Sequence, residues 1–225
     1  MLQARSLLEA IGRELQPVHD QLLHHPYLQA LDEGRVSREK LRLFAGEQYT
    51  TIRSDLRSVA QLVSRSGDAP SRDFFLGVLQ GERLAADALL AFARALGWST
   101  TDLDEYEPLP GAQAYACSMA WLALYGTTAE VAAGYLINFP AWGHNCGRMS
   151  RILQGRYGLG APDVAFFELF ATPPSDFEAS ALAILQEGLK QGAEERLVRR
   201  AARLLQSYEV LFWDTLYQAS VSGHG

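Results

Sequence analysis

One segment combines polar side chains that could line a ligand pocket with residues that kink a helix. Between Tyr135 and Gly147, an apolar run leads into a proline and then into two glycines four residues apart. Proline removes a backbone donor and kinks a helix, and glycines at this spacing share one helix face. We therefore expect a neighbouring helix or a flat ligand to approach this backbone closely. The side chains here that could point into a pocket are Asn138, Trp142, Asn145 and Cys146.

Two further polar residues interrupt apolar helix faces. Glu209 lies between Leu205 and Trp213 on an aromatic face near the C-terminus. Aromatic surroundings disfavour the charged form of a carboxyl, so Glu209 could be a general acid or base. A partner at Arg203, or exposure to solvent, would explain its position equally well. Gln48 interrupts another apolar stripe, where it is either satisfied by a neighbour or lines a cavity.

The cysteines and histidines form no motif that identifies a chemistry. Two cysteines, Cys117 and Cys146, are too few for a disulfide scaffold or a thiolate zinc site. Cys146 could be a nucleophile, but a small buried core residue is the simpler interpretation. The five histidines occur in no metalloprotease motif, and the chain has no glycine-rich phosphate loop. We expect no metal.

The composition argues against several classes of partner. The 225 residues are 48% hydrophobic and 20% charged, which is typical of a globular protein. A net charge of −6 without a basic run argues against nucleic-acid binding. The longest apolar run, from Val131 to Ile137, is far shorter than the roughly 20 residues of a membrane span, and the N-terminus lacks a signal-peptide core. We therefore expect a cytoplasmic protein with no membrane partner.

Apolar residues recur every three or four positions along almost the whole chain, which predicts an all-α fold with essentially no sheet. Capping boxes are predicted at Thr127–Glu130 and Ser175–Glu178, and Gly97 is expected to end a helix. No linker is long enough to separate domains, so we expect seven to nine helices in a single domain over residues 1–225. The expected helices cover about 37–65, 71–96, 113–125, 128–157, 163–170 and 193–219, with further pieces around Pro17 and Pro26.

Five short motifs follow one another along nearly the whole chain. They are His25-Pro-Tyr-Leu-Gln-Ala-Leu-x-x-Gly34, Phe44-x-x-Glu-Gln-Tyr49, the segment from Gly81-Glu82 to Leu96-Gly97, the helix with Pro140, and Tyr208-Glu209-x-x-Phe-Trp213. This order resembles the TenA group of the haem-oxygenase-like superfamily, which also contains PQQ-synthase and di-iron oxidase proteins. The resemblance implies one haem-oxygenase-like helical bundle around a central pocket, and oligomers are common among such proteins.

The resemblance is to TenA thiaminases, which hydrolyse thiamin breakdown products at an aminopyrimidine. It implies a catalytic role for Glu209, which matches the family's carboxylate. The family's cysteine nucleophile, however, falls at Ala141, its tyrosine one turn later at Asn145, and an aspartate at Gln48. An alanine cannot attack carbon, and Cys146 is only a weak substitute. The resemblance thus implies that water, rather than a cysteine, would be the nucleophile.

The two other chemistries of this superfamily match fewer residues. Di-iron sites need carboxylate and histidine ligands. Glu82 resembles the first ligand, but the other ligand positions hold Leu89, Asn138, Phe170, Pro174 and Phe177. Gly143 and Gly147 are similar to the glycine pair that lies on haem, yet no histidine between residues 19 and 25 is followed by the usual glutamate one turn later. The resemblance therefore implies no cofactor.

We therefore expect a pocket for a small flat nitrogen heterocycle similar to the pyrimidine of thiamin. Its expected residues are Gln48, Tyr49, Glu82, Asn138, Trp142, Asn145, Cys146, Tyr208 and Glu209. Trp142 and Tyr49 would stack on the ring. Asn138, Gln48 and Glu209 would hydrogen-bond to it. If the protein is an enzyme, we expect a TenA-like hydrolase of a C–N bond with Glu209 as general acid or base.

Two alternatives stay open at this stage. The first is a non-catalytic structural or small-molecule-binding homologue, whose polar residues satisfy one another. The second is a metal- or haem-dependent oxidase of the same fold. A homo-oligomer is also open, since Phe166, Phe167 and Phe170 could form an interface, although we favour the core for them.

Overall fold

The computed structural model describes residues 2–221, and every regular element in this range is helical, which confirms the predicted all-α class. Seven helices of 14 to 30 residues form the body, and four segments of 4 to 7 residues connect them. The elements are α1 (Leu2–Leu23), α2 (Pro26–Asp32), α3 (Leu41–Arg65), α4 (Ala69–Ala95), α5 (Thr100–Asp104), α6 (Pro110–Tyr125), α7 (Thr128–Tyr157), the 3₁₀ segment η1 (Ala161–Val164), α8 (Ala165–Ala171), α9 (Phe177–Lys190) and α10 (Glu195–Val221). Within residues 2–221, no helix is both long enough and apolar enough to span a membrane.

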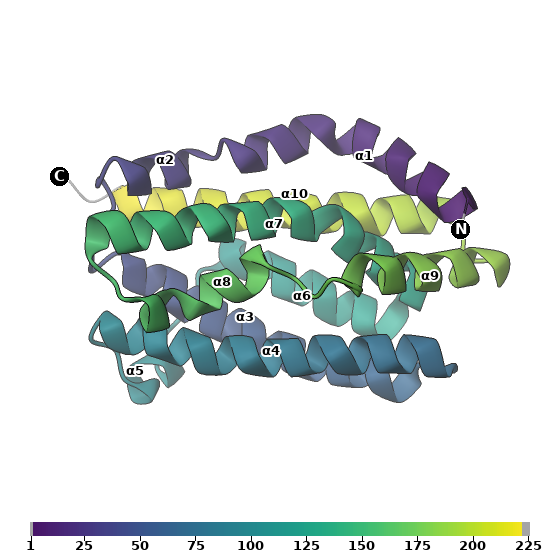
Figure 1. The fold of residues 1–225 in the computed structure, drawn as a ribbon, viewed down its shortest axis with the longest axis horizontal. Helices are drawn as coiled ribbons and strands as arrows, with labels where there is room; N and C mark the ends of the chain where they lie inside the picture. The colour runs from purple at the N-terminus through teal and green to yellow at the C-terminus, as the bar shows by residue number, and fades with distance from the viewer. Residues whose placement is uncertain (1, 222–225) are drawn as a thin grey trace.

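The long helices lie side by side along the length of the molecule (Figure 1). α1 covers one side of the bundle and packs on α7 and α10, whereas α4 forms the opposite side and packs on α3. α6 contacts both α3 and α10, and α8 and α9 pack along α7. As a result, α3, α4, α6, α7 and α10 surround the interior and can all direct side chains into it.

Most predicted helix ends agree with the structure, and the differences have local causes. The Thr127–Glu130 capping box is present, and Gly97 follows α4 in the left-handed conformation with φ of 80°. Pro17 does not interrupt α1, because it lies on an exposed face where water can pair with the carbonyl that loses its donor. The predicted capping box at Ser175–Glu178 is wrong, since the N-cap of α9 is Asp176 and it forms no side-chain cap.

Aromatic side chains gather around Phe44 of α3 at the centre of the core. The centroid of its ring lies within 6.4 Å of six other ring centroids, those of Phe92, Trp142, Phe166, Phe167, Phe212 and Trp213. Phe166 and Phe167 are fully buried, which confirms that they belong to the core. This cluster holds α3, α7, α8 and α10 together around the interior.

A neighbouring helix explains the two glycines that share a face of α7. A Cβ atom at Gly143 would lie 2.6 Å from the carbonyl oxygen of Phe170, at the end of α8. One at Gly147 would lie 3.4 Å from the Cβ atom of Ala171. Of the two expected partners, a helix or a flat ligand, the structure shows the helix.

Substituting Gly143 with alanine is expected to destabilise the protein by about 1–3 kcal/mol, because backbone atoms of α8 must move. Gly155→Ala on the same helix is the matched control, since no atom of residues 2–221 beyond the adjacent helix backbone lies within 4 Å of a Cβ placed there. The control should stabilise by roughly 0.5–1 kcal/mol, because alanine is the better helix former. Urea unfolding measures both changes. Equal stability of the two variants would show that the contact with α8 does not require glycine.

Candidate functional site

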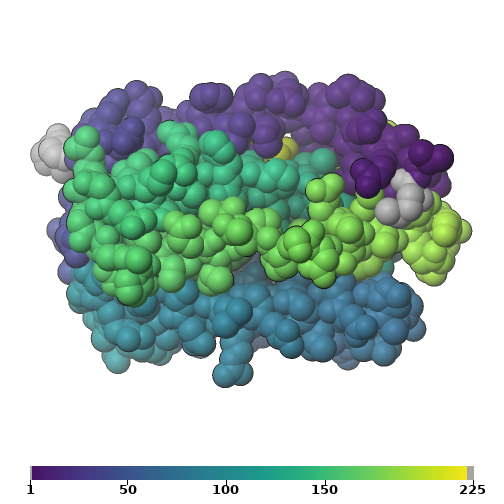
Figure 2. Space-filling view, viewed as in Figure 1, coloured from purple at the N-terminus to yellow at the C-terminus, as the bar shows by residue number. Residues whose placement is uncertain are grey.

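A cavity lies between the helices that surround the interior, and the centres of water-sized spheres can occupy about 50 Å³ of it. The cavity itself is larger than this figure, because each sphere extends beyond its centre. Its wall consists of Gln48, Thr51, Ile52, Asp55, Glu82, Tyr115, Tyr135, Asn138, Phe139, Trp142, Phe170, Glu209 and Phe212. Figure 2 shows that the molecular surface is furrowed where the segment with α8 and α9 meets α4. Glu82 of α4 and Phe170 of α8 belong to the cavity wall, so α4 and α8 border the cavity as well.

Glu209 of α10 is held in the cavity wall by two hydrogen-bond donors. Its Oε2 atom accepts a hydrogen bond from Asn138 Nδ2 at 2.5 Å, and its Oε1 atom accepts one from Trp213 Nε1 at 3.0 Å. The Asn138 Oδ1 atom in turn accepts a hydrogen bond from the Tyr115 hydroxyl at 3.3 Å. Burial raises the pKa of Glu209 to about 8, although the two hydrogen bonds lower it. Glu209 is therefore mostly protonated at neutral pH.

Two more carboxyl groups, Asp55 on α3 and Glu82 on α4, face the same cavity. Burial and then the negative charge of Glu82 raise the pKa of Asp55 well above its ordinary value. Burial also raises the pKa of Glu82 to about 7. The Asp55 Oδ1 atom and the Thr51 Oγ1 atom, one turn earlier, are buried and have no hydrogen-bond partner among the described residues. Within this part of the chain, the wall contains no lysine, arginine or histidine that could neutralise the acids.

Aromatic rings form much of the remaining wall. They belong to Tyr115, Tyr135, Phe139, Trp142, Phe170 and Phe212. Burial raises the pKa of Tyr115 and of Tyr135 well above the ordinary value, and the nearby acids add to the shift, so both phenols stay neutral. The cavity thus offers flat apolar faces beside acidic groups, an arrangement suited to a small ring that carries N–H donors.

The structure brings together five of the nine residues expected in the pocket. Those in the wall are Gln48, Glu82, Asn138, Trp142 and Glu209, whereas Tyr49, Asn145, Cys146 and Tyr208 are not part of it. The Tyr49 hydroxyl instead donates to Asp104 Oδ1 at 2.9 Å, and the Arg53 guanidinium lies over its ring. Asn145 is fully buried, and its Nδ2 atom donates to the carbonyl of Leu22 at 3.0 Å. Of the two rings expected to stack on a ligand, only Trp142 reaches the cavity.

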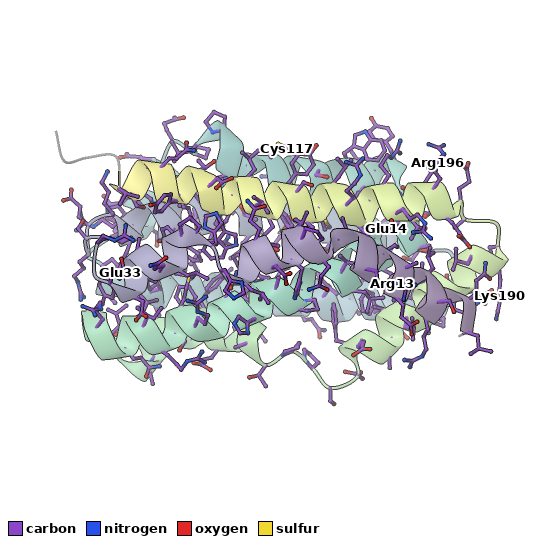
Figure 3. All side chains as sticks on the ribbon, turned by 90° about the horizontal axis from the view of Figure 1, so that it is seen from above. Arg13, Glu14, Glu33, Cys117, Lys190 and Arg196 are labelled. Atoms are coloured by element: carbon purple, nitrogen blue, oxygen red, sulfur yellow. The ribbon has the colours of Figure 1, made fainter. Side chains whose placement is uncertain are left out.

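Neither cysteine lies in the cavity wall. Cys146 belongs to the hydrophobic core, where burial and then the charge of Glu209 raise the pKa of its thiol well above the ordinary value. Cys117 is exposed on the outer surface of α6 (Figure 3). Ala141, at the position of the cysteine nucleophile in the resemblance, is also fully buried outside the wall. A reaction in the cavity would therefore need a nucleophile other than a cysteine of this chain.

Four polar wall residues are not among those expected from the sequence: Thr51, Asp55, Tyr115 and Tyr135. Thr51 and Asp55 follow Gln48 by three and seven residues, which places all three on one face of α3. Once Gln48 is taken to face a cavity, this spacing identifies the other two. The tyrosines have no comparable signal, because only the packing of α6 and α7 directs them inward.

The residues at the di-iron positions of the resemblance do not fit a metal. Leu89 and Phe177 are hydrophobic, so they offer no lone pair to an ion. Within residues 2–221, no group of three or more histidine, cysteine, aspartate or glutamate side chains is placed to hold a metal ion. Glu82 alone remains of the carboxylate and histidine ligands, and one carboxylate cannot hold two iron ions.

Comparison with known protein families shows to which family the chain belongs. The profile of the TENA/THI-4/PQQC family matches residues 13–219, which include every residue of the cavity wall. The chain belongs to this family. Its membership agrees with the all-α fold and with the interior cavity that the helices surround.

Two curated relatives of the chain carry different activities in their names. The chain is 28% identical over 135 residues to a 4-aminobenzoate synthase of Chlamydia muridarum, a match that covers 58% of this chain and 56% of the relative. It is 24% identical over 132 residues to an aminopyrimidine aminohydrolase of Halalkalibacterium halodurans, covering 58% of this chain and 59% of that protein. The match thus spans less than two thirds of the length of either relative.

Solved structures with a similar fold align with almost the whole chain. A TenA homologue from Pseudomonas syringae has a TM-score of 0.79 at 15% identity and covers 93% of this chain and 92% of its own. One from Pyrococcus furiosus has a TM-score of 0.74 at 18% identity, covering 93% and 99%. A domain from Shewanella denitrificans with a haem-oxygenase-like fold has a TM-score of 0.74 at 14% identity, covering 94% and 92%. At these identities the likeness establishes the haem-oxygenase-like fold.

Proposed function

We propose that the cavity binds a small flat nitrogen heterocycle similar to the pyrimidine of thiamin, and that the protein hydrolyses a C–N bond of this ligand. One observation carries the proposal: Asn138 and Trp213 hold the Glu209 carboxyl in the cavity wall, where burial keeps it mostly protonated. A carboxyl with a pKa near the working pH is suited to general acid–base catalysis. Family membership and the name of the aminohydrolase relative support this class of substrate.

Three wall residues would orient the ring. Trp142 offers a flat face, and its own ring is nearly parallel to that of Phe44, at an interplanar angle of 7°. Gln48 is buried in the wall and can donate or accept hydrogen bonds at the ring nitrogens. The Asn138 amide is held between Tyr115 and Glu209, so it keeps Glu209 in a fixed position beside the ring.

The proposed reaction uses water as the nucleophile. Water adds to the carbon that bears the leaving nitrogen, while protonated Glu209 donates its proton to that nitrogen. The C–N bond breaks and the amine leaves. The proton that the attacking water loses returns to the Glu209 carboxylate. One water molecule is consumed, one C–N bond is cleaved, and Glu209 ends in its starting form.

The substitution Glu209→Gln tests this role. We expect amine release from 4-aminopyrimidines and 5-aminomethylpyrimidines to fall by about 10²–10⁴-fold, since general acid–base catalysis contributes that much. Gln keeps the size of the side chain, so the shift in melting temperature caused by the same compounds should persist. Glu178→Gln, on the exposed face of α9, is the matched control and should change neither quantity.

Two other results would decide against the proposal. If the compounds shift the melting temperature but the unchanged protein releases no amine from any of them, the protein is a non-catalytic binder. If neither aminopyrimidines nor thiazoles shift the melting temperature, the cavity does not take a flat nitrogen heterocycle.

A further inference from the structure

The reaction proposed for Glu209 leaves two acids of the cavity without a role. Asp55 and Glu82 come from the adjacent helices α3 and α4 and face the same space. Neither takes part in a salt bridge within the described part of the chain. Glu209 has two hydrogen-bond donors, whereas the Asp55 Oδ1 atom has none in residues 2–221. These two carboxyls therefore need another partner.

A buried carboxyl without a partner is unfavourable in its charged form. Two carboxyls that share a site also repel each other when both are ionised. The pair can avoid this cost in two ways: it can keep protons, or it can bind a cation. Thr51, one turn before Asp55, favours cation binding, since its Oγ1 atom is also buried and has no partner among the described residues. Together the three side chains present unused hydrogen-bond acceptors to one side of the cavity.

The wall favours an organic cation over a metal ion. A metal ion would need more donors than this group provides, and no set of three ligating side chains is suitably placed in residues 2–221. Six aromatic side chains line the same cavity as the acids, and aromatic faces attract ammonium and guanidinium-like groups. Such groups also carry several N–H donors, which match the free acceptors of Asp55, Glu82 and Thr51.

We propose that Asp55, Glu82 and Thr51 form a subsite for the ammonium or amidinium group of a small organic cation. The N–H groups of the cation donate to the two carboxylates and to the Thr51 hydroxyl. The flat part of the same ligand lies against Trp142, beside Glu209. This subsite rests on the proposed function, since it defines the charged part of the heterocyclic ligand proposed above.

Binding of the cation should release protons. The titratable groups that face the subsite are Asp55 on α3, Glu82 on α4, Tyr115 on α6, Tyr135 on α7 and Glu209 on α10, while α8 contributes only a phenylalanine. A positive charge lowers the pKa of the two nearby carboxyls, and this opposes the increase that burial causes. Near pH 7 these carboxyls therefore lose protons on binding, whereas the two tyrosines stay protonated.

Benzamidinium and benzamide provide a matched pair of probes. They have nearly the same flat shape, but only benzamidinium carries a positive charge. We expect the full chain to bind benzamidinium about tenfold more tightly or better, as in other charge-assisted hydrogen bonds, when measured by isothermal titration calorimetry at pH 7. Titrations in two buffers of different ionisation enthalpy should show proton release for benzamidinium and none for benzamide.

Variants of both acids test the assignment. Asp55→Asn and Glu82→Gln keep the shape of each side chain, and each should reduce the preference for benzamidinium about tenfold, with less proton release. Asp87→Asn on α4 is the matched control, since it removes one negative charge from an exposed position and should keep the preference. If Asp55→Asn fails to fold, as circular dichroism would show, Glu82→Gln decides, because Glu82 is the less buried of the two acids.

The outcomes separate this inference from the function proposed above. Equal affinity for the two probes, or a preference that survives in both acid variants, overturns the cation subsite. If 4-aminopyrimidine still shifts the melting temperature in that case, the proposed heterocycle pocket stands without a cation subsite. If neither the probes nor the aminopyrimidines bind, both proposals fail.

Discussion

The Phe44→Ala variant is expected to lose about 3–5 kcal/mol of unfolding free energy, the usual cost of removing a buried phenylalanine ring. Phe44 is fully buried, and its ring contacts six others. Two of those rings, Trp142 and Phe212, line the cavity. The substitution should therefore also weaken binding of aminopyrimidines, because Trp142, the ring expected to stack on them, loses the neighbour that holds it in position. Urea unfolding and calorimetric titration measure the two effects.

The Phe75→Ala variant distinguishes an effect on stability from an effect on ligand binding in the cavity. Phe75 is also fully buried, but it belongs to the other core cluster and pairs with Phe74 at 5.2 Å between ring centroids. We expect a similar loss of stability with binding retained at temperatures where the variant is folded. Equal loss of binding in both variants would show that the cluster around Phe44 has no special role in shaping the cavity.

The helices could be predicted because their signals are local. Apolar spacing identified their faces, and the Thr127–Glu130 box and Gly97 marked two ends that the structure confirms. The failure at Ser175–Glu178 is also local. A Ser-x-x-Glu pattern permits a capping box but does not enforce one, and here α9 takes Asp176 as its N-cap instead.

The cavity could be predicted only in part, because neighbouring residues of a helix point in different directions. Consecutive residues are separated by about 100° around the axis, so Gln48 faces the cavity while Tyr49 turns towards Asp104. Asn138 and Asn145 do share a face. They lie about 10 Å apart along α7, however, and Asn145 reaches the end of α1 instead. Whether such a residue lines the cavity depends on how far its helix extends past the neighbouring helices, and no local sequence pattern predicts this.

The Glu209→Gln variant is expected to be more stable than the unchanged protein at alkaline pH and slightly less stable at pH 5. The pKa of Glu209 rises from 4.5 to about 8 on folding, chiefly because of burial. Between these values the folded state holds more protons than the unfolded state, so stability falls as pH rises through the folded pKa. At about 1.4 kcal/mol per pKa unit, this loss approaches 4–5 kcal/mol near pH 9. Gln cannot ionise, and its single amide oxygen accepts from only one of the two donors, Asn138 or Trp213, which costs about 1 kcal/mol at every pH.

The comparison isolates Glu209 because other titrating groups are present in both proteins. Burial lowers the pKa of His25 despite its hydrogen bond to Asp214, so the stability that depends on neutral His25 is lost as pH falls below about 6.5. Asp55 and Glu82 also have raised pKa values, so their contributions to stability are likewise lost as pH rises. All of these contributions cancel in the difference between the variant and the unchanged protein, measured by urea unfolding at pH 5, 7 and 9. A difference that stays constant over this range would mean that Glu209 does not hold its proton in the folded protein, and water rather than Glu209 would then have to supply the proton to the leaving nitrogen.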